Sequence, residues 1–160
     1  MHRLFCIPRV YEYLADGKAP PRDVANAWVS SAQQERSQYG GGLWAISTNE
    51  YTANIKGLVR LSDHHNGNME LTYLLHPSIW HKGVATRTAH TIIGACFDKG
   101  IVHTIWAGAD QPNLASIAVM KRLGMTFRNK AHYPLGPGVE YSITAQSYEP
   151  ALHEKVHISS

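Results

Sequence analysis

The sequence predicts a single α+β domain in which helices flank a mixed sheet, and two observations indicate this class. In the first half of the chain, short segments alternate apolar and polar residues, which is the period of strands. In the second half, strand-like and helix-like segments alternate, which is the order of a βαβ unit. The chain has 160 residues, of which 44% are hydrophobic and 17% charged, enough for one core. We expect one domain over residues 1–148 and a C-terminal tail over residues 149–160.

Charge and cysteine content narrow the class of protein. The formal net charge is +3 and the pI is about 8.9, which suits an anionic ligand, but basic residues are too sparse for a nucleic-acid surface. The two cysteines, Cys6 and Cys96, form no disulfide framework, and no apolar segment is long enough to cross a bilayer. We therefore expect a cytoplasmic protein that binds neither nucleic acid nor membranes.

The first forty residues are expected to be helical. Pro8 interrupts the first apolar segment and predicts short helical turns there. Residues 22–38 carry apolar side chains at helical spacing and predict one longer helix. The three glycines at residues 40–42 are expected to end this helix and to act as a flexible connector.

Three strands are predicted next, over residues 43–48, 54–61 and 69–75. Polar residues at 49–52 and 62–68 separate them and are typical of turns. The natural arrangement of such strands is an antiparallel meander.

Gly83 stands between the third strand and a helix that is expected to end before Gly100. The first N–H groups of a helix have no partner inside it, and the helix dipole adds partial positive charge, so an anion is stabilised there. Glycine lets the backbone approach a ligand closely, and Lys82 and Arg87 flank the turn with positive charge. The sequence therefore predicts a phosphate-binding turn at this helix start.

The remaining elements complete the βαβ order. Residues 102–107 favour a strand, and Asn113 precedes a second helix with apolar residues at helical spacing. Residues 125–130 and 139–145 are expected to form a closing hairpin with a long loop around residues 134–138.

Four motifs together resemble the GNAT family of acyl-CoA N-acyltransferases. They are ELTYLLHP at residues 70–77, WHKGVAT at 80–86, NLAS at 113–116 and KRLGM at 121–125. The resemblance is nearest to the ribosomal-protein N-terminal acetyltransferases and their small-molecule relatives.

The family's signature loop is Gln or Arg, two residues, Gly, one residue, then Gly or Ala. Gly83 and Ala85 match this pattern, and Trp80 replaces its first residue, as is frequent in that branch. The resemblance covers about residues 43 to 145. It implies a twisted mixed sheet that splays near its middle and holds acetyl-CoA, the co-substrate, in the cleft.

By resemblance, the pyrophosphate of acetyl-CoA would lie on the glycine turn and its pantetheine arm on the edge of the third strand. The residues implied to bind the cofactor are Tyr73, Leu74, Leu75, Lys82, Gly83, Val84, Ala85, Thr86, Arg87, Asn113 and Ser116. One departure concerns the N-terminus, because the family usually has a first strand before the segment that resembles residues 8–14. We expect this strand to be missing, and an uncovered sheet edge would then invite a homodimer.

Transfer of an acetyl group from a thioester to an amine requires a neutral amine and a proton for the departing thiolate. Glu70 lies in the strand that leads to the glycine turn and is the first candidate base, acting through water, although a surface strand glutamate is an equal alternative. His76 and His103 are rival bases, because imidazole titrates near neutral pH. Each of these histidines fits a purely structural position better.

The acid is harder to assign. Many family members use a tyrosine on the second predicted helix, and Met120 stands where it would be sought. Ser116 is therefore the candidate acid, with solvent as the alternative, and it could equally be a helix-capping serine. Asn113 is expected both to cap the helix and to bind pantetheine.

Other reactive residues favour structural roles. The cluster Asp63-His64-His65 falls in a predicted turn without cysteine or a helical His pair, so we expect no metal. Cys96 lies on the apolar face of a helix and is expected to be buried.

The sequence thus predicts an acetyl-CoA-dependent N-acetyltransferase that acts directly on a primary amine, either a protein N-terminus or a small molecule. The alternative is a catalytically weak acyl-CoA-binding or regulatory module. Acceptor specificity is expected to depend on the segment before Gly40 and on the loop around residues 132–138. The polar residues that could line such a pocket are His132, Tyr133, Glu140 and Tyr141.

Overall fold

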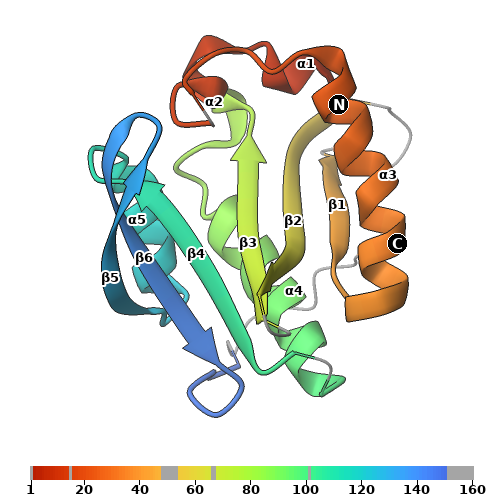
Figure 1. Ribbon diagram of the computed structural model, residues 1–160, viewed down its shortest axis with the longest axis vertical. Coiled ribbons are helices and arrows are strands. Elements are labelled where there is room, and N and C mark those ends of the chain that lie inside the picture. Colours follow the sequence, from red (N-terminus) through yellow and green to blue (C-terminus); the bar gives the residue numbers. More distant parts are fainter. Residues whose placement is uncertain (1, 15, 48–53, 66–67, 101, 151–160) are drawn as a thin grey trace.

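A computed structural model describes residues 2–14, 16–47, 54–65, 68–100 and 102–150, which form one six-stranded sheet with helices on both faces (Figure 1). The helices are α1 (His2–Phe5), α2 (Pro8–Tyr11), α3 (Arg22–Tyr39), the 3-10 turn η1 (Pro77–Ile79), α4 (Val84–Asp98) and α5 (Leu114–Arg122). The strands are β1 (Gly42–Ser47), β2 (Ile55–His65), β3 (Asn68–Leu75), β4 (Thr104–Asp110), β5 (Thr126–Tyr133) and β6 (Gly136–Thr144). The predicted α+β class with a mixed sheet is confirmed.

The strand order is β1-β2-β3-β4-β6-β5. The first three strands form the expected antiparallel meander, and β4 lies parallel to β3 after the crossover through α4. The last two strands return antiparallel to β4. The centre of the sheet is therefore the parallel junction between the meander and the C-terminal strands.

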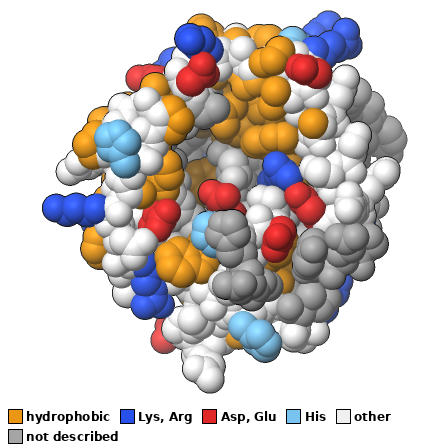
Figure 2. Space-filling view, viewed as in Figure 1, with side chains coloured by type: hydrophobic (Ala, Val, Ile, Leu, Met, Phe, Trp, Pro, Cys, Tyr) orange, Lys and Arg blue, Asp and Glu red, His pale blue; other side chains and the backbone are white. Residues whose placement is uncertain are grey.

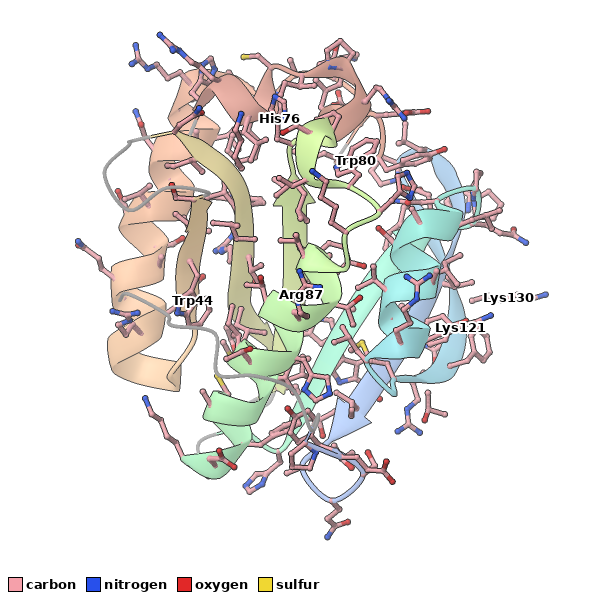
Figure 3. The ribbon with its side chains drawn as sticks, turned by 180° about the vertical axis from the view of Figure 1, so that it is seen from behind. Trp44, His76, Trp80, Arg87, Lys121 and Lys130 are labelled. Atoms are coloured by element: carbon pink, nitrogen blue, oxygen red, sulfur yellow. The ribbon has the colours of Figure 1, made fainter. Side chains whose placement is uncertain are left out.

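Each face of the sheet has its own core. Figure 3 views the molecule from behind, so that α4 and α5 lie in front of the sheet. Their buried side chains, such as Ile93 and Met120, pack on residues such as Ile105. Cys96 belongs to this core and burial raises the pKa of its thiol, so its expected packing role is confirmed. On the opposite face, α1, α2 and α3 cover the meander, where Phe5 packs among the buried side chains. No helix in the described part of the chain is long and apolar enough to cross a membrane.

The turn predicted at residues 62–68 is wrong over most of its length. β2 continues to His65, with Ser62 paired to Glu70 and Asp63 to Met69. Ladder hydrogen bonds satisfy the backbone of these polar residues, which outweighs their weak strand propensity. The turn predicted at residues 49–52 lies outside the described residues.

The C-terminal hairpin is tighter than predicted. Tyr133 pairs directly with Gly136, so Pro134 and Leu135 alone connect β5 to β6. Pro137 has no N–H to donate but keeps a place in β6, where its carbonyl accepts a hydrogen bond from the Gln111 backbone N–H at 2.9 Å.

The three glycines after α3 are not a connector. Gly40 ends the helix with a φ of 69°, and Gly42 is already paired with Leu61 in the sheet. As expected, β1 is the first strand of the described chain, where it pairs with β2 only and forms the edge of the sheet.

A partly buried ion pair joins α3 to the sheet. Arg60 of β2 donates from Nη2 to Glu35 Oε1 at 2.5 Å, and the two side chains are 16% and 12% exposed. The guanidinium also donates to Ser31 Oγ at 3.1 Å and lies 5.0 Å from the ring centroid of Trp28. Both charges are thus satisfied within the protein.

We expect Glu35→Gln to lower the free energy of unfolding by about 3 kcal/mol, because it leaves the Arg60 charge largely buried without its counter-ion. Urea unfolding measures this, with Glu149→Gln on the exposed surface as the matched control. A loss no larger than that of the control would mean that the ion pair contributes little to holding α3.

Candidate active site

The two central strands separate soon after they meet. β3 and β4 pair only at Met69 with Ile105 and at Glu70 with Trp106. Beyond Glu70, no described residue of β3 pairs with β4, so the β4-facing edge of its last residues is open to other partners. In Figure 1 the two strands diverge visibly from this point. The splay that the family resemblance implied is therefore present, and it opens towards the C-terminal ends of both strands.

The glycine turn lies at the end of β3 and opens α4. Gly83 precedes the helix with a φ of 70°, a conformation that favours glycine, and Arg87 N–H is the first to bond back, to Gly83 O at 3.0 Å. The N–H groups of Val84, Ala85 and Thr86 come before this first intrahelical bond and are available to an anion. The turn therefore has the geometry of a phosphate site.

Two cationic side chains surround this turn. Arg87 Nη1 donates to Lys82 O at 2.9 Å, which folds the guanidinium back over the turn, and Figure 3 shows Arg87 at the start of α4. A Cβ atom on Gly83 would lie 2.8 Å from Arg87 Nη1. Lys82 Nζ donates to Ser78 O at 2.9 Å. These contacts hold positive charge beside the unpaired N–H groups, which increases the attraction for an anion.

Across the split, the start of α5 faces β3. Asn113 caps this helix, with its Oδ1 accepting from Ser116 N–H at 3.2 Å, so the expected capping role is confirmed. Tyr73 of β3 donates its hydroxyl hydrogen to Ser116 O at 3.0 Å, and burial raises the pKa of Tyr73 to about 12. This bond ties the two sides of the split together behind the opening.

The end of β3 is partly occupied by the tryptophan of the signature loop. Trp80 Nε1 donates to Leu75 O at 2.7 Å, and the guanidinium of Arg9 lies 4.7 Å from the centroid of its ring. Leu74 points to the α1–α3 face and is 8% exposed, so only its backbone can face a ligand in the split. The carbonyl of Leu75 is thus already hydrogen-bonded, whereas the edge nearer the split is open.

Glu70 lies on the opposite face from α4, in a recess at the root of the split. The other residues that line this recess are His64, Trp106, Ala107, Gly108, Tyr133 and Glu140. Figure 2 shows this face of the molecule, with several acidic side chains near its centre. The predicted base therefore stands in a recess with other acidic and aromatic groups rather than on an open surface.

Tyr133 lies across the floor of the recess because two strand glycines leave room for it. A Cβ atom on Gly138 would overlap its ring, and one on Gly108 would overlap its hydroxyl. Burial, together with the negative charges of Glu140, Glu70 and Asp110, raises the pKa of Tyr133 to about 12. The hydroxyl is therefore protonated at neutral pH and acts as a hydrogen-bond donor rather than as a base.

Two polar atoms near the recess are buried without a hydrogen-bond partner in the described chain, Trp106 Nε1 and Asp110 Oδ1. Trp106 and Asp110 lie on the same face of β4 as Gly108, because Ala107 and Ala109 pack into the α4 core. Unsatisfied buried polar atoms are uncommon in native proteins. A buried water molecule is the simplest partner that would complete their hydrogen bonds.

The rival bases have other tasks or lie elsewhere. His76 Nδ1 accepts from Ser78 N–H at 3.1 Å and caps η1. His103 is exposed and precedes β4, on the closed side of the split. Asp63 and His64 belong to β2, and no group of three or more His, Cys, Asp or Glu residues in the described chain could hold a metal ion.

The two segments expected to determine acceptor specificity lie next to each other at α2 and the β5–β6 turn. A hollow of about 410 Å³ opens between α2 and the turn of the β5–β6 hairpin, lined by Glu12, Asp16 and Leu135 among others. A Cβ atom on Gly17 would lie 3.1 Å from Leu135 Cδ2, which shows how closely the two segments approach.

Of the four polar residues proposed for an acceptor pocket, two line the recess. Tyr133 and Glu140 do so, whereas His132 is exposed and Tyr141 packs into the core, with its ring 5.7 Å from that of Phe127. The sequence analysis missed Trp106 and Asp110. The sequence did carry a signal for them. The strand-like alternation of side chains continues past residue 107, and a glycine inside a strand, here Gly108, indicates that another group approaches the backbone closely.

Three solved structures have the same fold as this chain. AAC(6')-Ib in complex with ribostamycin and coenzyme A is 17% identical, with a TM-score of 0.74 over 96% of this chain and 91% of that chain. The microcin C7 self-immunity acetyltransferase MccE, in complex with acetyl-CoA and AMP, is 18% identical, with a TM-score of 0.71 over 89% of this chain and 84% of that chain. A GNAT-family acetyltransferase from Bacillus anthracis is 18% identical, with a TM-score of 0.71 over 91% and 87%.

At such low identities the solved structures establish the fold, and the family is established by sequence. The family described as "Acetyltransferase (GNAT) domain" matches residues 1–126, most of the chain, and includes the split, the glycine turn and α5. The match begins earlier than the resemblance found in the sequence and ends where the β5–β6 hairpin starts. The chain belongs to the GNAT acetyltransferase family.

Proposed function

We propose that the protein transfers the acetyl group of acetyl-CoA directly to a primary amine, in a complex that holds both substrates at once. The single observation that carries this proposal is the split between β3 and β4 with the glycine turn at its end. It offers an open strand edge and an anion site in one groove. Complexes of related proteins with acetyl-CoA or coenzyme A support the identity of the donor.

The donor would be held mainly by backbone groups. Its pyrophosphate would accept hydrogen bonds from the N–H groups after Gly83, with Arg87 and Lys82 adding charge. Its pantetheine amides would pair with the open edge of β3 around Tyr73. Asn113 uses Oδ1 in the helix cap, so its Nδ2 would donate to the pantetheine arm.

The chemistry would take place at the root of the split. Glu70 would accept a proton from the acceptor ammonium through a water molecule, and the neutral amine would then attack the thioester carbonyl. The tetrahedral intermediate would lose one N–H proton to water and collapse with cleavage of the C–S bond. The thiolate would take a proton from solvent, or from Ser116, which solvent would then reprotonate. The products are the amide and coenzyme A, so no metal or covalent enzyme intermediate is needed.

The acceptor would be a small amine or a protein N-terminus. Ribostamycin, bound in a related structure, is a small molecule and supports the former. The protein would work in the cytoplasm, where unpaired thiols such as those of Cys6 and Cys96 are expected. The outer edge of β1 is where a second copy would pair, and light scattering at the assay concentration tests for this homodimer.

The second candidate is a weak acyl-CoA-binding module without turnover. It is favoured by Met120, which is fully buried on α5 at the position where many family members carry a tyrosine that acts as general acid. The two candidates differ in whether thiol is released.

The experiment is calorimetric titration with acetyl-CoA, followed by measurement of free thiol when small amines or short peptides are added. Binding with amine-dependent thiol release supports the enzyme, and binding without release for any amine supports the module. If the folded protein does not bind acetyl-CoA, both are wrong.

A further inference from the structure

We infer that Tyr133 is a gate, whose ring turns out of the recess before an acceptor amine can reach Glu70. The inference rests on the proposed function and adds the residue that controls access of the acceptor. It concerns the tyrosine ring that lies on the backbone of β4 and β6 and lines the recess beside Glu70. We call this arrangement the closed state, and the arrangement with the ring turned away the open state.

The closed recess is too small for an acceptor. Its volume is about 10 Å³, which is room for about one water molecule. The nitrogen of an amine has the size of that water, so the carbon chain that carries the nitrogen needs space that the closed recess lacks. One of the side chains around Glu70 therefore has to move when an amine binds there.

The ring of Tyr133 rests on glycine backbone. Gly138 lies beneath one edge of the ring and Gly108 beneath the hydroxyl, and a Cβ atom at either position would overlap the tyrosine. Glycine inside a strand costs stability relative to alanine, so the pair of glycines indicates a seat shaped for this ring. Because the seat is backbone, it stays in place when the ring turns away.

Tyr133 also has an open side towards which it can turn. It is half-buried and is the last residue of β5, and no described strand lies beyond β5 in the sheet. The two residues that follow, Pro134 and Leu135, form the hairpin turn and are exposed. Rotation about the Cα–Cβ bond would carry the ring towards solvent and keep the backbone pairing of Tyr133 with Gly136.

The larger side chains that share the recess with Glu70 are tied to neighbours. Glu140 Oε2 accepts a hydrogen bond from Asn129 Nδ2 at 2.5 Å. The Nε1 atom of Trp106 is buried, and the ring centroid of Trp106 lies 5.7 Å from that of His64. The tyrosine is therefore the side chain that we expect to move.

Access to the recess can be measured without turnover, as the rate at which iodoacetamide alkylates the thiol of a Glu70→Cys variant. The parent protein also carries Cys6→Ser, because Cys6 is exposed whereas Cys96 is buried. Tyr133→Ala removes the ring, and Gly138→Ala places a methyl group where the ring lies. Each should raise the alkylation rate at least about tenfold, because a gated thiol reacts only in the open fraction of the molecules.

Two control variants and a urea series show whether the ring moves. Tyr133→Phe keeps a ring on the seat, and Tyr13→Ala removes a tyrosine that is 37% exposed outside the recess. Both should be alkylated within about twofold of the parent rate. The parent rate itself should not change in dilute urea, because turning one side chain exposes little surface. A parent rate that rises with urea as steeply as unfolding does would mean that the ring stays in place, which overturns the inference.

The gate also predicts a change in kinetics, because a closed state lowers the apparent affinity for the acceptor. For an amine that the wild type acetylates, Tyr133→Ala should lower KM about tenfold and leave kcat within about twofold. Damage to the site would lower kcat instead.

Equal alkylation rates for Tyr133→Ala and its parent overturn the inference and leave the acetyltransferase intact, and an unchanged KM overturns it as well. Faster alkylation in a protein that acetylates no amine supports the gate, and in that case only the proposed function fails. Tyr133→Ala decides the question even if Gly138→Ala does not fold, because it removes atoms from the recess and adds none.

Discussion

Replacing Glu70 with glutamine is expected to lower kcat about 100-fold, the usual contribution of a positioned general base. Glutamine keeps the shape and hydrogen-bonding capacity of the side chain but cannot take a proton at neutral pH. Glu70 lies in the recess on the face opposite α4, away from the glycine turn, so affinity for acetyl-CoA should stay within about twofold of wild type. Thiol-release assays measure kcat, and calorimetric titration measures the affinity for acetyl-CoA.

The pH dependence of the activity of Glu70→Gln distinguishes the loss of a general base from a change in the shape of the site. Without the carboxylate, only acceptor molecules that are already deprotonated in solution can react. The activity of Glu70→Gln should then rise steeply with pH, by about tenfold per unit below the pKa of the amine. Full activity of this variant over the whole range would mean that another group, or water alone, removes the proton. Glu149→Gln carries the same change on the exposed surface and controls for net charge.

The glycine turn, where the cofactor is proposed to bind, could be predicted because its signal is local. A strand, a glycine and a helix start follow one another in the chain, and an anion would be held there by backbone N–H groups whose position depends on Gly83 rather than on distant partners. For the same reason the strands and long helices around it were predicted within a few residues. The errors lie in turns, where the pairing of β2 with β3 extended the strands through Asp63.

The recess around Glu70 could not be predicted in the same way because its parts are distant in sequence. Glu70, Trp106 and Tyr133 belong to three strands, and they come together only through the order of β3, β4, β6 and β5. The tight turn at Pro134 and Leu135 brings Tyr133 back over the sheet, whereas the sequence suggested a long loop. Polar candidates could be named, but the sequence alone did not show which of them share a face.

Replacing Gly83 with aspartate is expected to weaken acetyl-CoA binding at least about 100-fold, or about 2.7 kcal/mol. The new Cβ atom would lie 2.8 Å from Arg87 Nη1, so the guanidinium would have to move, and the carboxylate would compete with phosphate for the same N–H groups. Aspartate tolerates the φ of 70° better than most residues, so most of the loss would come from charge and from the displaced Arg87 rather than from the backbone. Calorimetric titration with acetyl-CoA measures it.

Two further variants separate these causes. Asparagine has the same size and backbone tolerance as aspartate but no charge. We therefore expect the affinity of Gly83→Asn for acetyl-CoA to lie between those of Gly83→Asp and the wild type. Gly100→Asp is the control for folding, because Gly100 also has a positive φ, 63°, and nothing lies within 4 Å of its added Cβ atom at the far end of α4. It should bind acetyl-CoA as the wild type does. If Gly83→Asp also bound acetyl-CoA normally, the phosphates would not lie on this turn, and the split alone would have to hold the donor.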